Sequence, residues 1–169
     1  MSNQPQAVIL MGVSGSGKTA VGIRLADELG WPFYDGDDFH PRENVEKMSN
    51  GIPLDDEDRT QWLAALHEMI VKHLTQDQSM LMACSALKQK YRDQLAGGNT
   101  GTVFVYLKGD FDLIFERMRV RSGHYMKAEM LRSQFDALEE PNDALHVDVN
   151  QSLDVIVDQI ITELRLLGE

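Results

Sequence analysis

The sequence predicts an α/β fold of three layers, in which a mainly parallel sheet is covered by helices on both faces. Short apolar runs bounded by turn residues alternate with longer segments whose apolar residues recur every three or four positions. Strands that alternate with helices of this length favour right-handed crossovers and a parallel sheet. With 169 residues, 43% of them hydrophobic, we expect residues 1–169 to form a single domain with a substantial core.

The expected elements follow from these runs. Buried strands are predicted at residues 7–11, 79–84, 102–107 and 145–149, and a shorter one at 31–34. Amphipathic helices are predicted at residues 19–29, 59–74, 110–119, 127–138 and 153–167. Gly30 stands where a helix C-cap belongs, and the acidic run 55–58 precedes the second helix.

Composition excludes several classes of protein. A formal net charge of -11 disfavours a nucleic-acid partner, because the surface repels phosphate backbones. No run approaches the roughly 20 apolar residues of a membrane span, and the polar residues 1–6 do not resemble a signal peptide. The single cysteine, Cys84, allows no disulfide within the chain, and we expect it to be a small buried hydrophobe. Together these features favour the cytoplasm.

Residues 12–19 match the phosphate-binding motif G-x-x-x-x-G-K-[ST] in full. The motif follows a predicted strand and leads into a predicted helix, which is the arrangement that this loop requires. Its backbone N–H groups would cradle phosphates, Lys18 would reach the β- and γ-phosphates, and Thr19 would bind Mg²⁺. The expected ATP-binding residues are Gly12, Val13, Ser14, Gly15, Ser16, Gly17, Lys18 and Thr19. The alternative is a glycine-rich turn that binds no ligand.

An acidic segment follows the second predicted strand, at the sheet edge where α/β proteins bind ligands. It contains Asp35, Asp37 and Asp38, whose mutual repulsion calls for a cation or a hydroxyl as partner. We expect Asp35 to hold Mg²⁺, Asp37 to take the proton of an acceptor hydroxyl, and Asp38 to be a bystander. His40 is a further candidate contact to the acceptor. An acidic surface turn is the alternative.

Three basic residues are candidates for binding the acceptor. Arg59 starts a predicted helix, and its planar guanidinium suits a substrate carboxylate; the alternative is an ion pair with the acidic run before it. Lys88 and Arg92 follow the strand that ends near Ser85, again at the ligand-bearing edge. Many P-loop proteins carry a metal-binding aspartate where this chain has Ser85, which favours Asp35 as the residue on the metal side.

Basic residues also cluster at 117–121. We expect a small mobile lid at about residues 117–130, in which Arg117 and Arg121 share a helix face and stabilise the transferring phosphoryl group. The alternative is a stabilising interaction with the helix dipole. The chain lacks the N-K-x-D guanine motif of GTPases. A small ATP-dependent kinase is therefore the first interpretation, and a regulatory nucleotide-binding module is the alternative.

Several blocks resemble the bacterial gluconokinase family, among the P-loop kinases related to shikimate and adenylate kinases. Besides the P-loop, the matching blocks cover residues 35–41, 44–48, 51–54, 58–59, 62–63, 84–88, 91–93 and 133–135, in the order of that family. The resemblance implies ATP-dependent phosphorylation of D-gluconate to 6-phospho-D-gluconate by a homodimer. It also implies that Asp35 lies on the metal side, Asp37 on the acceptor side, and Arg59 on the substrate carboxylate. A kinase for another small hydroxy acid, such as idonate or shikimate, is the alternative. Residues 147–151 resemble the stretch that borders adenine, where no single residue is assigned.

Overall fold

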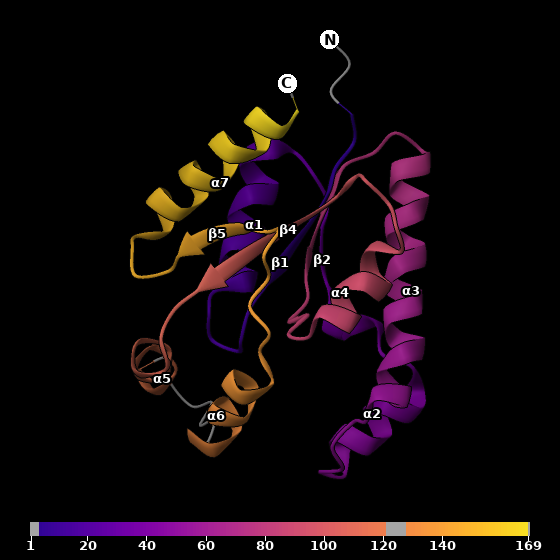
Figure 1. Cartoon of the computed structure of the whole chain (residues 1–169), viewed down its shortest axis with the longest axis vertical. Coiled ribbons are helices and arrows are strands. Elements are labelled where there is room, and N and C mark those ends of the chain that lie inside the picture. Colours follow the sequence, from indigo (N-terminus) through magenta and orange to yellow (C-terminus); the bar gives the residue numbers. More distant parts are fainter. Residues whose placement is uncertain (1–3, 121–127, 169) are drawn as a thin grey trace.

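The computed structural model describes residues 4–120 and 128–168, and within them the chain forms an all-parallel sheet with strand order β2-β3-β1-β4-β5 (Figure 1). The strands are β1 (Ala7–Met11), β2 (Phe33–Asp35), β3 (Met80–Ala83), β4 (Thr102–Lys108) and β5 (Leu145–Asp148). Each lies within two residues of its predicted position at either end. The predicted parallel sheet is confirmed.

The two faces of the sheet are covered by different helices. Val8 and Leu10 of β1 join the core under α1 (Lys18–Leu29) and α7 (Leu153–Leu167). Ile9 and Met11 point to the other face, where α3 (Asp56–Thr75) and α4 (Gln89–Ala96) pack. Every residue of β1 is fully buried. A strand covered on both faces explains why its sequence is continuously apolar rather than alternating.

The ends of the helices follow local rules. Gly30 adopts a left-handed conformation with φ of 70° and donates its N–H to the carbonyl of Ala26, as the sequence predicted for a C-cap. Helix α3 begins at Asp56, three residues before the predicted start, so the acidic run forms its first turn. Asp55 and Asp58 exchange side-chain and backbone hydrogen bonds there in a capping box. The carboxylates also face the positive end of the helix dipole.

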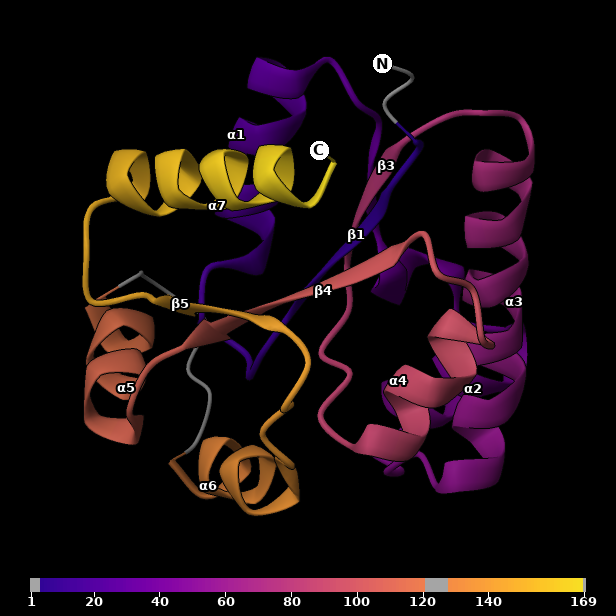
Figure 2. The same cartoon turned by 45° about the horizontal axis from the view of Figure 1, so that its top comes forward.

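Four short helical elements surround the end of the sheet to which the strands point (Figures 1 and 2). They are the 3-10 helix η1 (Gly36–Phe39), α2 (Arg42–Ser49), α5 (Phe111–Val120) and α6 (Ala128–Ala137). Ile114 of α5 and Leu131 of α6 form a small core with Val13, which anchors both helices beside the P-loop. Helices α2 and α4 were not predicted. The predicted lid at residues 117–130 lies partly outside the described residues.

Within residues 4–120 and 128–168, no helix combines the length and the apolar character needed to cross a membrane.

Candidate active site

The P-loop joins β1 to α1 and forms the centre of the site. Gly12 has φ of 146°, and a Cβ there would come within 2.9 Å of the carbonyl oxygen of Leu107, so this position requires glycine. Gly17 is left-handed and caps the N-terminus of α1. The Oγ of Ser16 is buried and has no hydrogen-bond partner among the described residues. An unpaired polar atom inside this loop fits a site for phosphate oxygens.

Lys18 lies in the P-loop and is held by it. Its ammonium donates hydrogen bonds of 2.9 Å to the carbonyl oxygens of Gly12 and Val13. Burial lowers the pKa of Lys18, while the charges of Asp37 and Asp35 act in the opposite direction. A cation in this place can neutralise phosphate charge. Its attraction for phosphate is strengthened because the surroundings are poorly hydrated.

Two of the three aspartates of the acidic segment, Asp35 and Asp37, lie close together at the end of β2. Asp35 pairs in register with Ala83 of β3 and caps η1, accepting a 3.0 Å hydrogen bond from the backbone N–H of Asp37. The pKa of Asp37 is raised, first by desolvation and then by repulsion from Asp35. The Asp37 side chain is 76% exposed, and the charge of Asp35 acts in the same direction as the desolvation.

One cavity, of about 680 Å³, lies beside the P-loop and this acidic segment. We call it the Trp62 cavity. It brings together the predicted residues Ser14, Asp37, His40, Arg59 and Lys88. Its remaining wall comes from α2, the first turns of α3, the loop after β3, and α6. Residues that are distant in sequence thus converge on one site.

His40 is packed tightly on the wall of the Trp62 cavity. Its ring stacks on Trp62 with centroids 4.2 Å apart and an interplanar angle of 17°. The indole N–H of Trp62 donates to the carbonyl oxygen of Gly36 at 2.7 Å, which holds the Trp62 ring in place under His40. The Nε2 atom of His40 lies 3.8 Å from Oδ1 of Asp37. Burial lowers the pKa of His40, partly offset by the charge of Asp37.

Three cationic side chains, those of Arg59, Lys88 and Lys90, lie near the ring of Tyr91. The guanidinium carbon of Arg59 and the ammonium of Lys88 each lie 5.7 Å from the centroid of the Tyr91 ring. Arg59 also donates a 3.4 Å hydrogen bond to the Tyr91 hydroxyl. Of these three, Arg59 and Lys88 line the Trp62 cavity, and two cations there form a site suited to an organic carboxylate.

The acidic run before Arg59 is paired with other residues. Asp58 pairs with Lys47 at 2.9 Å, and Asp56 pairs with Lys90 and accepts a hydrogen bond from Tyr91. These partners lower the pKa of Asp56 to about 2. Among the described residues, no carboxylate lies within ion-pair distance of Arg59. The structure therefore does not contain the ion pair between Arg59 and the acidic run that was the alternative.

Arg92 does not line the Trp62 cavity. Its side chain is buried, and its guanidinium donates to the carbonyl oxygens of Ala86, at 2.6 Å, and Glu139, at 2.7 Å. It also donates to the side chain of Gln89. Arg92 therefore ties the loop after β3 to the segment after α6. It lies at the predicted edge of the sheet but points into the protein.

A second cavity, of about 670 Å³, lies on the other side of the P-loop; we call it the Arg117 cavity. It is lined by Gly15, Ser16 and Gly17, by side chains of α1 and α5 including Arg117, and by Gln151, Leu153 and Ile156. Arg119 instead pairs with Glu116 on the exposed surface. Arg121 lies outside the described residues.

Gln134 of α6 was not singled out by the sequence analysis, although it falls in one of the blocks that resemble the kinase family. Its Oε1 accepts a 2.7 Å hydrogen bond from the backbone N–H of Ser14, and its Nε2 donates to the Ser14 hydroxyl at 3.0 Å. The two residues are 120 positions apart. Gln134 thus connects α6 to the P-loop at the wall of the Trp62 cavity.

Comparison with known proteins gives consistent results. A family model described as shikimate kinase matches residues 14–165. The thermoresistant gluconokinase of Escherichia coli (strain K12) is 47% identical over 161 residues, covering 93% of this chain and 92% of that protein. The gluconokinase of Gluconobacter oxydans (strain 621H) is 40% identical, covering 98% and 94%. The crystal structure of a gluconokinase from Sinorhizobium meliloti 1021 has a TM-score of 0.88 at 42% identity, covering 98% and 95%.

Proposed function

The chain belongs to the gluconokinases within the shikimate kinase family, and on this premise we propose that it transfers the γ-phosphoryl group of ATP to the terminal hydroxyl of D-gluconate. The products are ADP and 6-phospho-D-gluconate. The observation that carries the choice of acceptor is that Arg59 and Lys88 line the same cavity as Asp37, beside Tyr91. Gluconate has a carboxylate for the two cations and a primary hydroxyl for the aspartate.

The two cavities suggest how the reactants are arranged. ATP would occupy the Arg117 cavity, with its phosphates on the P-loop, and gluconate the Trp62 cavity. Asp37 would accept the proton of the terminal hydroxyl as that oxygen attacks the γ-phosphorus and the bond from phosphorus to the bridging oxygen of ADP breaks. Lys18 would neutralise the charge that develops on the phosphate oxygens, with Arg117 and Arg121 from the lid side.

Thr19 and Asp35 would hold Mg²⁺. The described residues contain no cluster of three or more histidine, cysteine, aspartate or glutamate side chains around a possible metal position. This donor set suits Mg²⁺, because kinases bind the ion through one or two side chains together with substrate phosphates. The ion supplies neutralisation of phosphate charge.

The decisive experiment is a coupled ADP-release assay with MgATP and a panel of acceptors: gluconate, idonate, shikimate, glycerate, glucose and nucleoside monophosphates. We expect turnover selective for gluconate, and its loss in Lys18→Ala. Selective turnover of another hydroxy acid would retain the kinase and change the acceptor. Binding of ATP without turnover of any acceptor would favour a regulatory module.

We further infer that the chain works in the cytoplasm as a homodimer, with the whole chain as one domain and residues 117–130 as its lid. The inference rests on the family resemblance and on the single cysteine, which suits a reducing compartment. Light scattering on the purified protein tests the assembly, since the monomer has a mass of 19.1 kDa. A monomeric mass at assay concentration would contradict it.

A further inference from the structure

Two buried polar side chains next to Asp37 have no part in the mechanism above. His40 lies just before α2 and Asn44 lies in its first turn, and Asn44 is only 3% exposed. The Nδ2 atom of Asn44 lies 2.9 Å from the backbone carbonyl oxygen of Asp58 and 3.3 Å from Nδ1 of His40. A buried amide with two such neighbours constrains where the protons of both side chains can be.

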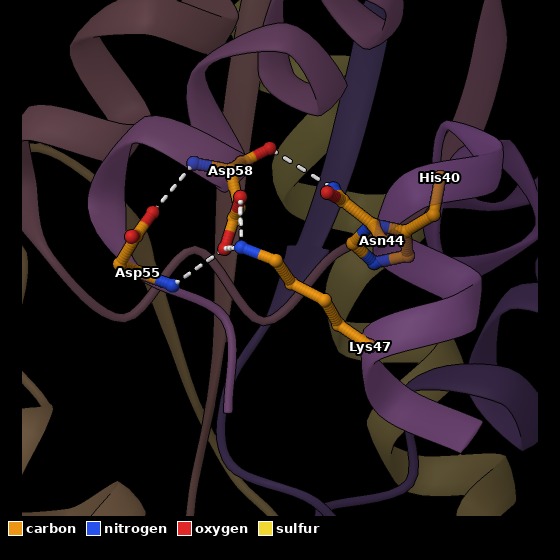
Figure 3. A network of polar contacts seen from close by, with 5 residues as sticks. All are labelled: His40, Asn44, Lys47, Asp55 and Asp58. Carbon is orange, nitrogen blue, oxygen red and sulfur yellow. Dashed lines mark hydrogen bonds and ion pairs between the residues drawn. The ribbon is translucent and has the colours of Figure 1, made fainter. Parts of the chain in front are cut away.

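The carbonyl of Asp58 fixes the orientation of the Asn44 amide. A carbonyl oxygen can only accept, so it must face the NH₂ group of Asn44 and not its oxygen. Asp58 is itself held in place: its carboxylate receives Lys47 at 2.9 Å and takes part in the capping box with Asp55. Figure 3 shows the side chains of Asn44 and Lys47 pointing toward Asp58 from α2.

This orientation determines the tautomer of His40. Since Nδ2 of Asn44 can only donate, Nδ1 of His40 must accept, and a neutral imidazole that accepts at Nδ1 carries its proton on Nε2. The neutral form is favoured because burial and the nearby charge of Arg59 both lower the pKa of His40, although Asp37 opposes them. The protonated nitrogen of His40, Nε2, is therefore the one that lies 3.8 Å from Oδ1 of Asp37.

We propose that Asn44 is a positioning residue that holds His40 as the Nε2–H tautomer, so that His40 donates a hydrogen bond to an acceptor hydroxyl seated between its ring and Asp37. The 3.8 Å gap is too long for a direct hydrogen bond. A hydroxyl oxygen at about 2.8 Å from both atoms bridges it, accepting from His40 and donating to Asp37. The proposal deepens the proposed function and rests on it for the identity of the hydroxyl.

The tautomer is tested directly by ¹⁵N-detected NMR of the imidazoles in the whole protein at pH 8. The same spectrum contains its own references. His67 and His73 face carbonyl oxygens through Nδ1, so they carry the proton there, whereas His146 faces one through Nε2. We expect His40, assigned from its absence in His40→Gln, to give the pattern of His146. A His40 with the pattern of His67 and His73 overturns the proposal.

Variants test the functional consequence. In Asn44→Asp a carboxylate faces Nδ1, so the proton of His40 should move to Nδ1, and kcat/KM for gluconate should fall by about tenfold to a hundredfold with KM for ATP unchanged. His40→Gln should retain several times the activity of His40→Asn, because the longer amide reaches the position of Nε2. The two His40 variants leave Asn44 intact, which keeps the test valid if Asn44→Asp does not fold.

The outcomes separate this proposal from the proposed function. If the wild-type protein turns over none of the acceptors, the proposed function fails, whatever the NMR spectrum shows. If the wild-type protein phosphorylates gluconate and Asn44→Asp moves the proton without loss of kcat/KM, the positioning role is wrong. Equal activities of His40→Gln and His40→Asn would also overturn it.

Discussion

At the scale of single residues, Arg59 illustrates how a cation can remain available for a ligand in a strongly acidic region. Four acidic residues precede it, and two of them already have a lysine partner, Lys47 for Asp58 and Lys90 for Asp56. The hydrogen bond from Arg59 to Tyr91 is long, at 3.4 Å. The guanidinium therefore retains donors for a substrate carboxylate.

Arg59→Ala should raise KM for gluconate by about tenfold to a hundredfold, the usual cost of removing a charged hydrogen bond, with KM for ATP changed less than about twofold. Steady-state kinetics with each substrate varied in turn measure both constants. Lys90→Ala is the matched control, because it removes the same charge from an exposed ion pair nearby. An equal rise of KM for gluconate in the control would mean that Arg59 acts only by adding positive charge to this region, not by a specific contact.

Asp37→Asn should lower kcat by about 10²- to 10⁴-fold, since it removes the proposed base. It should also raise Tm slightly at pH 7 in the absence of nucleotide and Mg²⁺. The pKa of Asp37 is raised in the folded state, so the folded chain binds more protons, and the free energy of unfolding falls as pH rises through the interval between the two pKa values. Thermal melts at pH 7 and pH 3 check the sign.

The difference in Tm between Asp37→Asn and the wild-type protein should vanish at pH 3, where the wild-type carboxyl is protonated in both states. A difference of the same size at both pH values would assign it to packing instead. A kcat close to that of the wild-type protein would show that Asp37 only positions the acceptor.

Which site residues could be predicted from the sequence depends on the distance to their partners. Lys18, Asp37 and Arg59 follow predicted strands or begin a predicted helix, so topology alone brings them to one edge of the sheet. Asn44 and Gln134 could not be assigned a role, because their partners are 14 and 120 residues away. Such contacts depend on the packing of helices, which periodicity does not specify.

At the scale of elements, the strands and the long helices were predicted because each has a continuous or regularly spaced apolar face. Helix α2 was missed because Asn44 is its only buried residue, while its apolar Val45 and Met48 are exposed. In α4 one of the three buried residues is Arg92. Helices held by buried polar groups carry no hydrophobic periodicity, so a pattern search passes over them.

Helix α6 connects the P-loop with the wall of the Trp62 cavity through Gln134 and Ser14. Gln134→Ala should lower kcat by about tenfold, because Ser14 loses two hydrogen bonds that orient it. A double-mutant cycle with Ser14→Ala isolates the hydroxyl contact and should give a coupling of about 0.5–3 kcal/mol in the free energy of unfolding. Additive effects of the two substitutions would mean that the contact between Gln134 and the Ser14 hydroxyl does not contribute to stability.

Two roles can be tested for Arg92: it holds the loop after β3 in place, or it binds the substrate. Ala86 in this loop has φ of 46°, an uncommon conformation for alanine, and its carbonyl oxygen receives Arg92 at 2.6 Å. Arg92→Met should lower the free energy of unfolding by about 2–5 kcal/mol, since it leaves the carbonyl oxygens of Ala86 and Glu139 buried without that donor. Urea denaturation measures the change.

A direct role of Arg92 on the acceptor predicts the opposite result. The Arg92→Met protein would then keep its stability and show a raised KM for gluconate. Lys88→Met is the matched control, because Lys88 lines the Trp62 cavity and has no such backbone contacts in the described residues. Lys88→Met should change KM for gluconate with little change in the free energy of unfolding.

At the scale of the whole molecule, a site that contains several cationic side chains sits on a negatively charged protein. The net charge is -11, yet Lys18, Arg59 and Lys88 line one edge of the sheet where two anionic substrates are proposed to bind. Long-range repulsion and local attraction therefore act on the same ligands. They differ in range, because salt screens exposed distant charges far more than close pairs in a cavity.

We therefore expect kcat/KM for gluconate to rise as ionic strength increases from about 10 mM to about 150 mM, over which the Debye length falls from about 30 Å to about 8 Å. Screening removes the repulsion of the whole molecule while the contacts of Arg59 in the cavity persist. The measurement is kcat/KM at constant free Mg²⁺, with kcat at saturation as the control, which should change little. A fall of kcat/KM with added salt would mean that local attraction also governs the approach of the substrate, and that the acidic surface has no part in it.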